Sequence, residues 1–389
     1  MSKQDSIRTR TVRAALETDT QHGAVVPPIH LTSTFAFSGY GEKREYDYSR
    51  SGNPTRDALG RALADLEGGS GAVVTASGMG AVSLVTQLFK PNQLAVVPHD
   101  CYGGTYRLFN ALKLRGALQV RFVDFQDAAA LDAAMADRPA LVWIETPSNP
   151  LLRIVDIADV AARARAAGAL VAADNTFLSP VWQRPLALGA DLVIHSTTKY
   201  LNGHSDIVGG AVIAATAELH EQVKWWGNCI GVTGAPFDSF LTLRGLRTLH
   251  ARMRAHGENA QRIADLLTRH RAVARVYYPG LAAHPGHDIA QRQQQGFGAM
   301  VSFELTGGVE NVKALLGNME LFSLAESLGG VESLVAHPAS MTHAAMDAVA
   351  RERAGISETL VRLSIGIEEG DDLVRDLTAG LEAAARVGR

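Results

Sequence analysis

Short, mostly apolar runs recur along the first 215 residues of the chain and predict strands. Seven of them lie at residues 72–75, 94–98, 119–123, 140–145, 169–173, 192–194 and 209–215. Segments with a helical spacing of apolar residues separate most of these runs, as at residues 128–136 and 156–167. Strands that are apolar on both faces belong to a sheet that helices cover on both sides. The pattern therefore predicts an α/β domain with a mainly parallel, doubly wound, seven-stranded sheet.

The two ends of the chain differ from this middle part. Residues 1–60 are rich in Thr, Ser, Pro and Gly with little periodicity, which predicts an arm without a core of its own. After the sheet, a long helical region from residue 237 to about 270 leads into predicted strands at 299–305 and 360–367 and predicted helices at 309–317 and 371–386. We therefore divide the chain into the arm (1–60), an α/β domain (61–255) and a smaller α+β domain (256–389).

The composition is that of a globular protein with small-molecule partners. Of the 389 residues, 47% are hydrophobic and 20% are charged, and the formal net charge is −3. This balance gives no basic surface for nucleic acid or for an anionic membrane. Cys101 and Cys229 are too few for a disulfide framework, which favours a reducing, cytoplasmic compartment.

Neither a secretory signal nor a membrane span is predicted. Residues 1–20 contain charges throughout and have no apolar core of the kind that a signal peptide needs. Residues 68–89 carry no charge, but they include five glycines, three serines and two threonines. A segment this polar does not suit a lipid-facing helix, so we interpret it as a strand, a loop and a buried helix.

The polar residues that could bind a ligand or take part in a reaction follow the predicted strands, where ligands of such sheets bind. The strand at 192–194 ends at His195, and the hydroxyls of Ser196 and Thr198 then lead to Lys199. Burial of a lysine lowers its pKa, and the free amine can form a Schiff base with a carbonyl group. Asp174 ends the preceding strand, where a carboxylate would suit the pyridinium nitrogen of pyridoxal phosphate. Taken singly, a surface lysine and a helix-capping aspartate remain the simpler explanations.

An anion site is predicted where Ser77, Gly78 and Met79 begin an apolar helix. Free backbone N–H groups and the helix dipole favour a phosphate at such a start, with Ser196 and Thr198 facing it. A plain helix cap by Ser77 is the alternative.

Two other motifs compete with this interpretation. Gly78-x-Gly80 with Asp100 is a partial dinucleotide fingerprint, but Ser83 stands where the third glycine belongs. Ser196-x-x-Lys199 matches a motif of serine acyl-transferases, but neither S-D-N nor K-T-G occurs in the chain.

A set of motifs, in order along almost the whole chain, resembles the Cys/Met-metabolism family of pyridoxal-phosphate enzymes. The motifs are Tyr48-Ser49-Arg50 with Asn53-Pro54-Thr55, Ser77-Gly78-Met79, Tyr102-Gly103-Gly104, and those at residues 145–150, 174–177, 195–206, 326–330 and 362–364. The resemblance implies pyridoxal-phosphate fold type I, which is aspartate-aminotransferase-like. Within the family, the chain is most similar to the bacterial γ-synthases.

The resemblance implies a role for each residue of the cofactor site. Lys199 carries the cofactor, Tyr102 stacks on its ring and Asn149 binds its 3′-oxygen, while Tyr48 and Arg50 reach the phosphate from a neighbouring subunit. The implied cofactor residues are Tyr48, Arg50, Ser77, Gly78, Met79, Tyr102, Asn149, Asp174, Thr176, Ser196, Thr198 and Lys199, and the implied catalytic residues are Lys199, Tyr102 and Tyr48. A core tyrosine at 102, a turn residue at 149 and a surface arginine at 50 remain open alternatives.

The family's substrate residues also have matches in this chain. Arg362 would take the substrate α-carboxylate with its rigid guanidinium fork. Asp47 and Arg107 would line the distal pocket, although both could be ordinary surface charges. Glu326 matches an acid of the family's γ-synthases and γ-lyases rather than its β-lyases. The implied substrate residues are Asp47, Arg107, Asn149, Glu326, Ser327 and Arg362.

The implied reaction is a γ-replacement in methionine biosynthesis by trans-sulfuration. O-succinyl-L-homoserine, or the O-acetyl ester, and L-cysteine would give L-cystathionine and succinate. The alternative within the family is a γ-lyase that cleaves cystathionine to cysteine, 2-oxobutyrate and ammonia. A nicotinamide-dependent dehydrogenase and a non-catalytic binding protein are kept as alternatives from other classes.

The resemblance further implies a homo-oligomer, at least a dimer and by expectation a tetramer of two dimers. Several histidines invite a metal interpretation, among them His99 beside Asp100, and the pair His284 and His287. None has the spacing of a known zinc or iron motif, so no metal is predicted.

Overall fold

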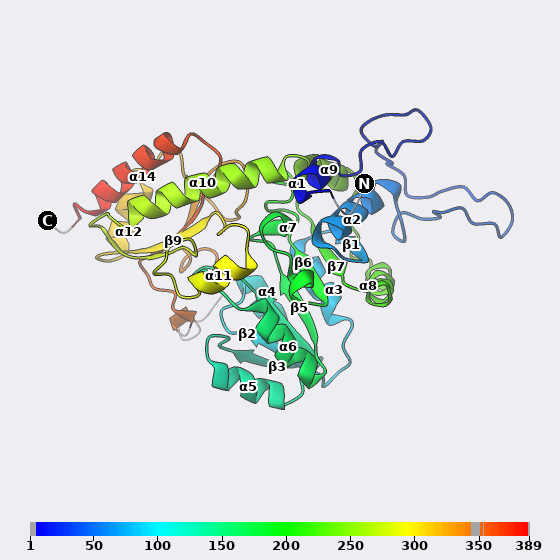
Figure 1. Cartoon of the computed structure of the whole chain (residues 1–389), viewed down its shortest axis with the longest axis horizontal. Helices are drawn as coiled ribbons and strands as arrows, with labels where there is room; N and C mark the ends of the chain where they lie inside the picture. Colours follow the sequence, from blue (N-terminus) through cyan, green and yellow to red (C-terminus); the bar gives the residue numbers. More distant parts are fainter. Residues whose placement is uncertain (1–4, 344–350, 353, 388–389) are drawn as a thin grey trace.

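The computed structural model of the chain describes residues 5–343, 351–352 and 354–387, and two sheets form its framework (Figure 1). The larger sheet has seven strands in the order β1-β7-β6-β5-β4-β2-β3. They are β1 (Gly71–Thr75), β2 (Leu94–Pro98), β3 (Gln119–Val123), β4 (Leu141–Glu145), β5 (Leu170–Asp174), β6 (Leu192–His195) and β7 (Gly210–Ala214). All seven predicted strands are confirmed, with ends that differ by one residue at most. β7 runs antiparallel to both of its neighbours, β1 and β6, and the other neighbouring pairs are parallel, so the sheet is mainly parallel.

Helices cover both faces of this sheet, which explains why its strands are mostly apolar. The helices of this part of the chain are α2 (Pro54–Glu67), α3 (Gly78–Thr86), α4 (Gly103–Leu114), α5 (Ala128–Ala136), α6 (Ile157–Ala167), α7 (Ser179–Trp182), the 3₁₀ helix η1 (Pro185–Leu188), α8 (Ala217–Ile230) and α9 (Pro236–Leu246). Trp143 and Ile194 belong to the apolar cluster that includes α3, α4 and α8. Val142 and Ile144, on the opposite face, belong to the cluster that includes α5 and α6. The doubly wound arrangement is therefore confirmed.

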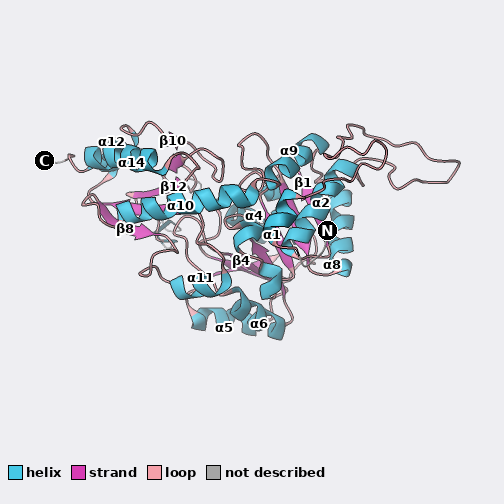
Figure 2. Ribbon diagram, turned by 45° about the horizontal axis from the view of Figure 1, so that its top comes forward, coloured by secondary structure: helices cyan, strands magenta, loops and turns pink. Residues whose placement is uncertain are grey.

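The second sheet of the framework has five strands in the order β10-β11-β12-β9-β8. Its strands are β8 (Val273–Tyr277), β9 (Met300–Leu305), β10 (Ser323–Leu324), β11 (Leu334–Ala336) and β12 (Leu360–Ser364). The helices of this part are α10 (Leu249–Leu267), α11 (His287–Gln293), α12 (Val309–Leu316) and α14 (Gly370–Ala384). Figure 2 shows α12 and α14 side by side next to this sheet.

The predictions for this part were incomplete. The strands β9 and β12 and the helices α12 and α14 are confirmed, but β8, β10 and β11 were missed. Strands β10 and β11 have only two and three residues, and β8 carries an exposed arginine, Arg275, in its centre. The single helical region predicted for 237–270 is two helices, because the chain leaves the helical path between α9 and α10.

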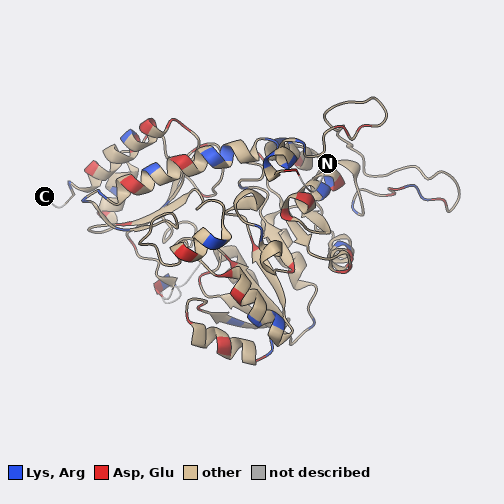
Figure 3. Ribbon diagram, in the orientation of Figure 1, with Lys and Arg blue, Asp and Glu red and all other residues tan. Residues whose placement is uncertain are grey.

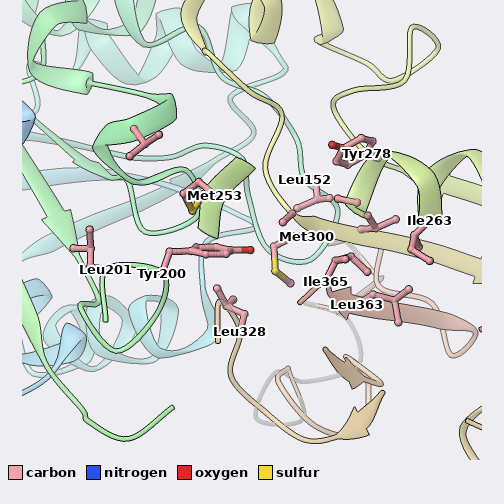
Figure 4. Close-up of a cluster of buried hydrophobic side chains, with 14 of the residues drawn as sticks. Leu152, Tyr200, Leu201, Met253, Ile263, Tyr278, Met300, Leu328, Leu363 and Ile365 are labelled. Atoms are coloured by element: carbon pink, nitrogen blue, oxygen red, sulfur yellow. The ribbon is translucent and has the colours of Figure 1, made fainter. Parts of the chain in front are cut away.

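One apolar core joins the two sheets, and Figure 4 shows part of it. Tyr200 lies in it directly after the turn that follows β6, together with Met253 of α10, Met300 of β9 and Leu363 of β12. The predicted domain boundary between residues 255 and 256 falls inside helix α10. The division at this point and at residue 60 stays a prediction.

The first part of the chain contributes little to this core. Helix α1 (Ile7–Val12) lies beside α2, with Arg10 Nε 2.9 Å from Asp65 Oδ2. Between α1 and Pro54 the chain forms no further helix and no strand longer than an isolated bridge, and in Figure 1 it loops away from the body. Leu31 and Phe37 are exposed on it. Asn53 ends the arm as the cap of α2, with its Oδ1 accepting from Thr55 N at 3.0 Å.

Charges of both signs are mixed over the surface, as Figure 3 shows along α10 and α14. Within the described ranges, no helix has both the length and the apolar composition that crossing a bilayer requires.

Candidate active site

Lys199 stands in the turn that follows β6 and points toward the smaller sheet. Its Nζ donates a hydrogen bond to Ser327 Oγ at 2.6 Å. The next residue, Tyr200, is fully buried, and its carbonyl oxygen accepts from Arg252 of α10 at 2.8 Å. The apolar core and this buried arginine therefore fix the backbone on which Lys199 stands.

The surroundings of Lys199 favour its uncharged form. Burial lowers the pKa of Lys199 to about 8, and the positive charge of Arg362 acts in the same direction, while Glu326 opposes both. A lysine with this pKa has far more free amine at neutral pH than an ordinary surface lysine. The free amine is the form that attacks a carbonyl group or accepts a proton.

The loop before β11 holds Ser327 against this lysine in an unusual backbone conformation. Ser327 has a φ of 87°, which few residues other than glycine adopt. Two residues later, Gly329 has a φ of 78°, and a Cβ there would lie only 2.8 Å from Tyr200 N. Gly329 N donates to Ser364 Oγ at 2.9 Å. The loop is thus tied both to β12 and to the lysine turn.

Arg362 lies in β12, is 3% exposed and presents its guanidinium to the same place. It donates to Asn149 Oδ1 and to the carbonyl oxygen of Ser327, each at 2.9 Å. Burial lowers its pKa to about 10, which still leaves the group charged at neutral pH. Within the described part of the chain, no carboxylate forms an ion pair with Arg362, and its Nε has no partner. A buried guanidinium in this state suits a carboxylate of a ligand.

Two carboxylates lie side by side at the ends of β4 and β5. Glu145 and Asp174 are in register in the parallel ladder. Glu145 Oε2 accepts from the backbone N of Tyr102 at 2.7 Å, and its Oε1 accepts from Trp143 Nε1 at 3.2 Å. Burial and the charge of Asp174 raise the pKa of Glu145 to about 8.

The pKa of Asp174 is also shifted by its surroundings. Burial raises its pKa, whereas hydrogen bonds from Thr176 act in the opposite direction. Thr176 N lies 3.0 Å from Asp174 Oδ1, and none of the described lysines, arginines or histidines forms an ion pair with this carboxylate. A cationic ring nitrogen would supply the missing partner.

The predicted anion site is assembled at the start of α3. Ser77 caps the helix, with its Oγ accepting from Gly80 N at 3.0 Å. A Cβ at Gly78 would lie 2.8 Å from the Cβ of Ser196, so only glycine lets the two segments approach this closely. Ser196 N donates to Thr176 Oγ1 at 2.9 Å. Thr198 Oγ1 accepts from Gly209 N at 3.0 Å, which holds Thr198 in the same turn as Lys199.

Tyr102 begins α4 with its ring partly exposed at this site. A Cβ at Gly104 would lie 2.8 Å from Met79 Sδ and even closer to the Tyr102 ring, so Met79 and Tyr102 are neighbours. Arg107, one turn further along α4, is exposed and forms no ion pair with a described residue. Glu326 is also exposed, but its charge reaches both Lys199 and Arg362.

Three of the predicted residues are not brought to this site within the chain. Asp47 pairs with Lys43 at 2.9 Å, and hydrogen bonds from Lys43 and Ser51 lower its pKa to about 2. The guanidinium carbon of Arg50 lies 5.7 Å from the centre of the Tyr48 ring. Arg50 Nε donates to Asn228 Oδ1 of α8 at 3.1 Å. The predicted place of Tyr48 and Arg50 in a neighbouring subunit's site and that of Asp47 in the distal pocket both stay predictions.

The contacts of Asp100 and Lys199 argue against the two competing motifs. Asp100 Oδ2 accepts from Ser148 Oγ at 2.7 Å and from Arg153 at 2.9 Å, so this buried carboxylate is not available to a nucleotide ribose. Lys199 bonds Ser327, and no hydrogen bond joins it to Ser196 Oγ among the described contacts. In the described ranges, no three His, Cys, Asp or Glu side chains come together as a metal site.

Comparison with known proteins decides the family. The family model of the Cys/Met metabolism PLP-dependent enzymes matches residues 8–382. The chain belongs to this family. Its members require pyridoxal 5′-phosphate (PLP), so the chain is a PLP-dependent enzyme.

Relatives of this family match the chain over its full length. The cystathionine gamma-synthase of Escherichia coli is 58% identical over 97% of this chain and 98% of its own. The cystathionine beta-lyase of Coxiella burnetii is 48% identical over 98% of this chain and 99% of its own. The crystal structure of cystathionine gamma synthase from Xanthomonas oryzae, in complex with aminoacrylate and cysteine, is 60% identical, with a TM-score of 0.97 over 98% of this chain and 99% of that one. The predicted family and the predicted PLP fold type I are both confirmed.

The residues of the site fit the family's cofactor. The start of α3, packed by Gly78 against Ser196, offers free N–H groups to a phosphate. The buried carboxylate of Asp174 would pair with the ring nitrogen, and Lys199 supplies an amine of lowered pKa. We expect Ser77, Thr176, Ser196 and other predicted residues around them to hold PLP here. Glu145 was not among the predicted site residues, although its place at the end of β4, in register with Asp174, could have marked it.

Proposed function

We propose that this enzyme catalyses γ-replacement, joining O-succinyl-L-homoserine and L-cysteine to give L-cystathionine and succinate. In this reaction the Cγ–O bond of the ester breaks and a bond between Cγ and the cysteine sulfur forms. The main support is the identity of 58% to 60%, over nearly the whole chain, to proteins named cystathionine gamma-synthase. Relatives named beta-lyase and gamma-lyase are 48% and 46% identical.

Bound PLP supplies an electron sink for negative charge at the substrate's Cα and Cβ. Lys199 is the base that we assign to the Cα proton, because its amine is held by Ser327 and its pKa is lowered to about 8. The buried guanidinium of Arg362 would bind the α-carboxylate, and its bond to Asn149 fixes the direction of the fork. Glu326 adds a negative charge beside both cations, where it would attract the substrate's ammonium group.

A direct comparison of two rates tests this function. Purified enzyme is assayed for cystathionine synthesis from O-succinyl-L-homoserine plus cysteine, and separately for cleavage of cystathionine to 2-oxobutyrate. We expect synthesis to have the higher kcat/KM. A higher kcat/KM for cleavage would overturn the proposal in favour of a cystathionine γ-lyase.

Arg107 provides a test of ester preference. It is an exposed arginine on α4 about one turn after Tyr102, so it could pair with the succinyl carboxylate at the rim of the site. Replacing Arg107 by alanine should lower kcat/KM for the succinyl ester by roughly tenfold, the effect of one charge-assisted hydrogen bond. The acetyl ester has no second carboxylate, so its kcat/KM should change little.

Arg115, which follows α4 and is also exposed, gives a matched control. The variant Arg115→Ala should leave both esters unaffected. Equal losses on the two esters in Arg107→Ala would remove Arg107 from the substrate pocket.

We further propose that the site is shared between subunits and that the enzyme is a homotetramer of two dimers in the cytoplasm. Tyr48 and Arg50 lie on an arm without a core and make no contact with Lys199 in their own chain. A mixture of Arg50→Ala and Lys199→Ala subunits should therefore regain activity, because each hybrid dimer holds one intact site. Random exchange limits the recovery to about one quarter of the wild-type activity.

The control for this experiment mixes Lys199→Ala with Lys199→Arg subunits. Every site then lacks the lysine, and no activity should return. Verified hybrids of the first pair that stay inactive would contradict a shared site.

A further inference from the structure

A buried carboxylate outside the site, that of Glu67, ties together two strand ends that carry site residues. Glu67 is the last residue of α2, and its side chain is inaccessible to solvent. Its Oε1 lies 2.6 Å from His195 Nε2 and accepts from Asn175 Nδ2 at 2.8 Å. One carboxylate oxygen therefore bonds both side chains, and the tautomer of His195 decides which partner donates in the histidine contact.

The two residues that bond Glu67, Asn175 and His195, are sequence neighbours of predicted cofactor residues. Asn175 directly follows Asp174, and His195 directly precedes Ser196. Successive side chains of a strand point to opposite faces, so Glu67 holds Asn175 from the side opposite to the Asp174 carboxylate. Asn175 N also donates to the carbonyl oxygen of Ile194 at 2.9 Å, which extends the ladder between β5 and β6 to this point.

The same network reaches the end of a third strand. Asn175 Nδ2 also donates to the carbonyl oxygen of Gln183 at 2.7 Å. Gln183 Nε2 in turn donates to Asn175 Oδ1 at 3.1 Å and to the carbonyl oxygen of Thr146 at 3.0 Å. Thr146 directly follows Glu145, which holds Tyr102. A single polar cluster therefore fixes the ends of β4, β5 and β6.

The hydrogen bonding of this cluster indicates that it positions side chains rather than stabilises the fold. Glu67 Oε2 and His195 Nδ1 are both buried, and neither has a hydrogen-bond partner among the described residues. Replacing such a buried contact by apolar packing of the same volume is often neutral or stabilising for a fold. The contact instead fixes orientation, because two hydrogen bonds to one oxygen restrict the side chains of Asn175 and His195.

We propose that Glu67 is a positioning residue for the cofactor: through Asn175 and His195 it sets the places of Asp174 and of the turn from Ser196 to Lys199. Glu67 itself does not contact PLP. This inference rests on the proposed cofactor roles of Asp174, Ser196 and Lys199. It adds that α2, whose other end carries the arm with Tyr48 and Arg50, contacts at Glu67 the two segments that bear the cofactor residues of its own chain.

The test measures PLP binding to the apo-protein by its visible absorption. The variant Glu67→Leu keeps the volume but loses the acceptor, and we expect the Kd for PLP to rise by about tenfold. We also expect the dependence of the absorption spectrum on pH to shift, which a loss of stability alone would not cause. Glu67→Gln keeps one acceptor oxygen and should bind PLP within about threefold of the wild type.

Asp65, on the same helix but paired with Arg10 of α1, provides the control. The variant Asp65→Leu should keep the wild-type Kd and spectrum. If Glu67→Leu does not fold, Asn175→Ala removes one of the two side chains that bond Glu67 and should weaken PLP binding by at least about threefold. Wild-type binding in either folded variant, or equal weakening in Glu67→Gln and Glu67→Leu, would overturn the proposal. A wild-type chain that binds no PLP would instead contradict the cofactor site itself.

Discussion

Replacing Lys199 by alanine should remove the visible absorption of the bound cofactor and lower turnover by about a thousandfold or more, while the protein stays folded. The reason is that Lys199 is the amine of lowered pKa at the centre of the site, bonded to Ser327 and surrounded by the predicted cofactor residues. Its neighbour Tyr200 fills the core, but the Lys199 side chain does not, so the fold does not depend on it. The measurements are the absorption spectrum, the rate of cystathionine formation and the circular dichroism of the purified variant.

Two further variants show which property of this lysine matters. Lys199→Arg retains a positive charge but has no free amine at accessible pH, so it should be as inactive as the alanine variant. Lys224→Ala, on the exposed surface of α8, should behave like the wild type. A Lys199→Ala protein with the native spectrum and rate would refute the assignment of Lys199.

Replacing Arg362 by leucine should raise the KM for the amino-acid substrate by about a hundredfold, with a smaller effect on kcat. The guanidinium is buried between Asn149 and Ser327, and a substrate carboxylate there would gain two charge-assisted hydrogen bonds in a place of low dielectric constant. Losing them corresponds to about 3 kcal/mol. Steady-state kinetics on the succinyl ester measures the change.

Arg362→Lys separates charge from shape. The ammonium group keeps the charge but cannot bond Asn149, Ser327 and a carboxylate with one planar fork, so KM should still rise by roughly tenfold. Arg275→Leu, on the exposed strand β8 of the same sheet, is the control and should leave KM unchanged. An unchanged KM in both Arg362 variants would mean that the carboxylate binds elsewhere.

The larger sheet could be predicted from the sequence because helices cover both of its faces and its strands are therefore mostly apolar. The smaller sheet could be predicted only in part: β9 and β12 show an apolar pattern, whereas β10 and β11 are too short to show one. Helices α9 and α10 were predicted as one helical region because only two residues, Arg247 and Thr248, separate them.

The residues of the site differ in how far the sequence could reveal them. Lys199 and Asp174 could be found because they follow apolar strands. The contacts of Glu67 with His195, 128 residues away, and of Arg362 with Asn149, 213 residues away, depend on the tertiary fold. No local pattern marks such pairs. Asp47, Tyr48 and Arg50 are not brought to the site within one chain, so their predicted roles stay predictions.

The core that joins the two sheets has a consequence for recombination between relatives. Tyr200, beside the lysine, and Leu363, beside the arginine, pack in this one core with Met253 of α10. A chimera joined near residue 255 would cut through α10 and would assemble the core from two parental sequences. Mismatched volumes there would displace the lysine relative to the arginine even if every site residue were kept. Exchange of substrate specificity within the family therefore has to carry the whole of this core, not only the residues that touch the substrate.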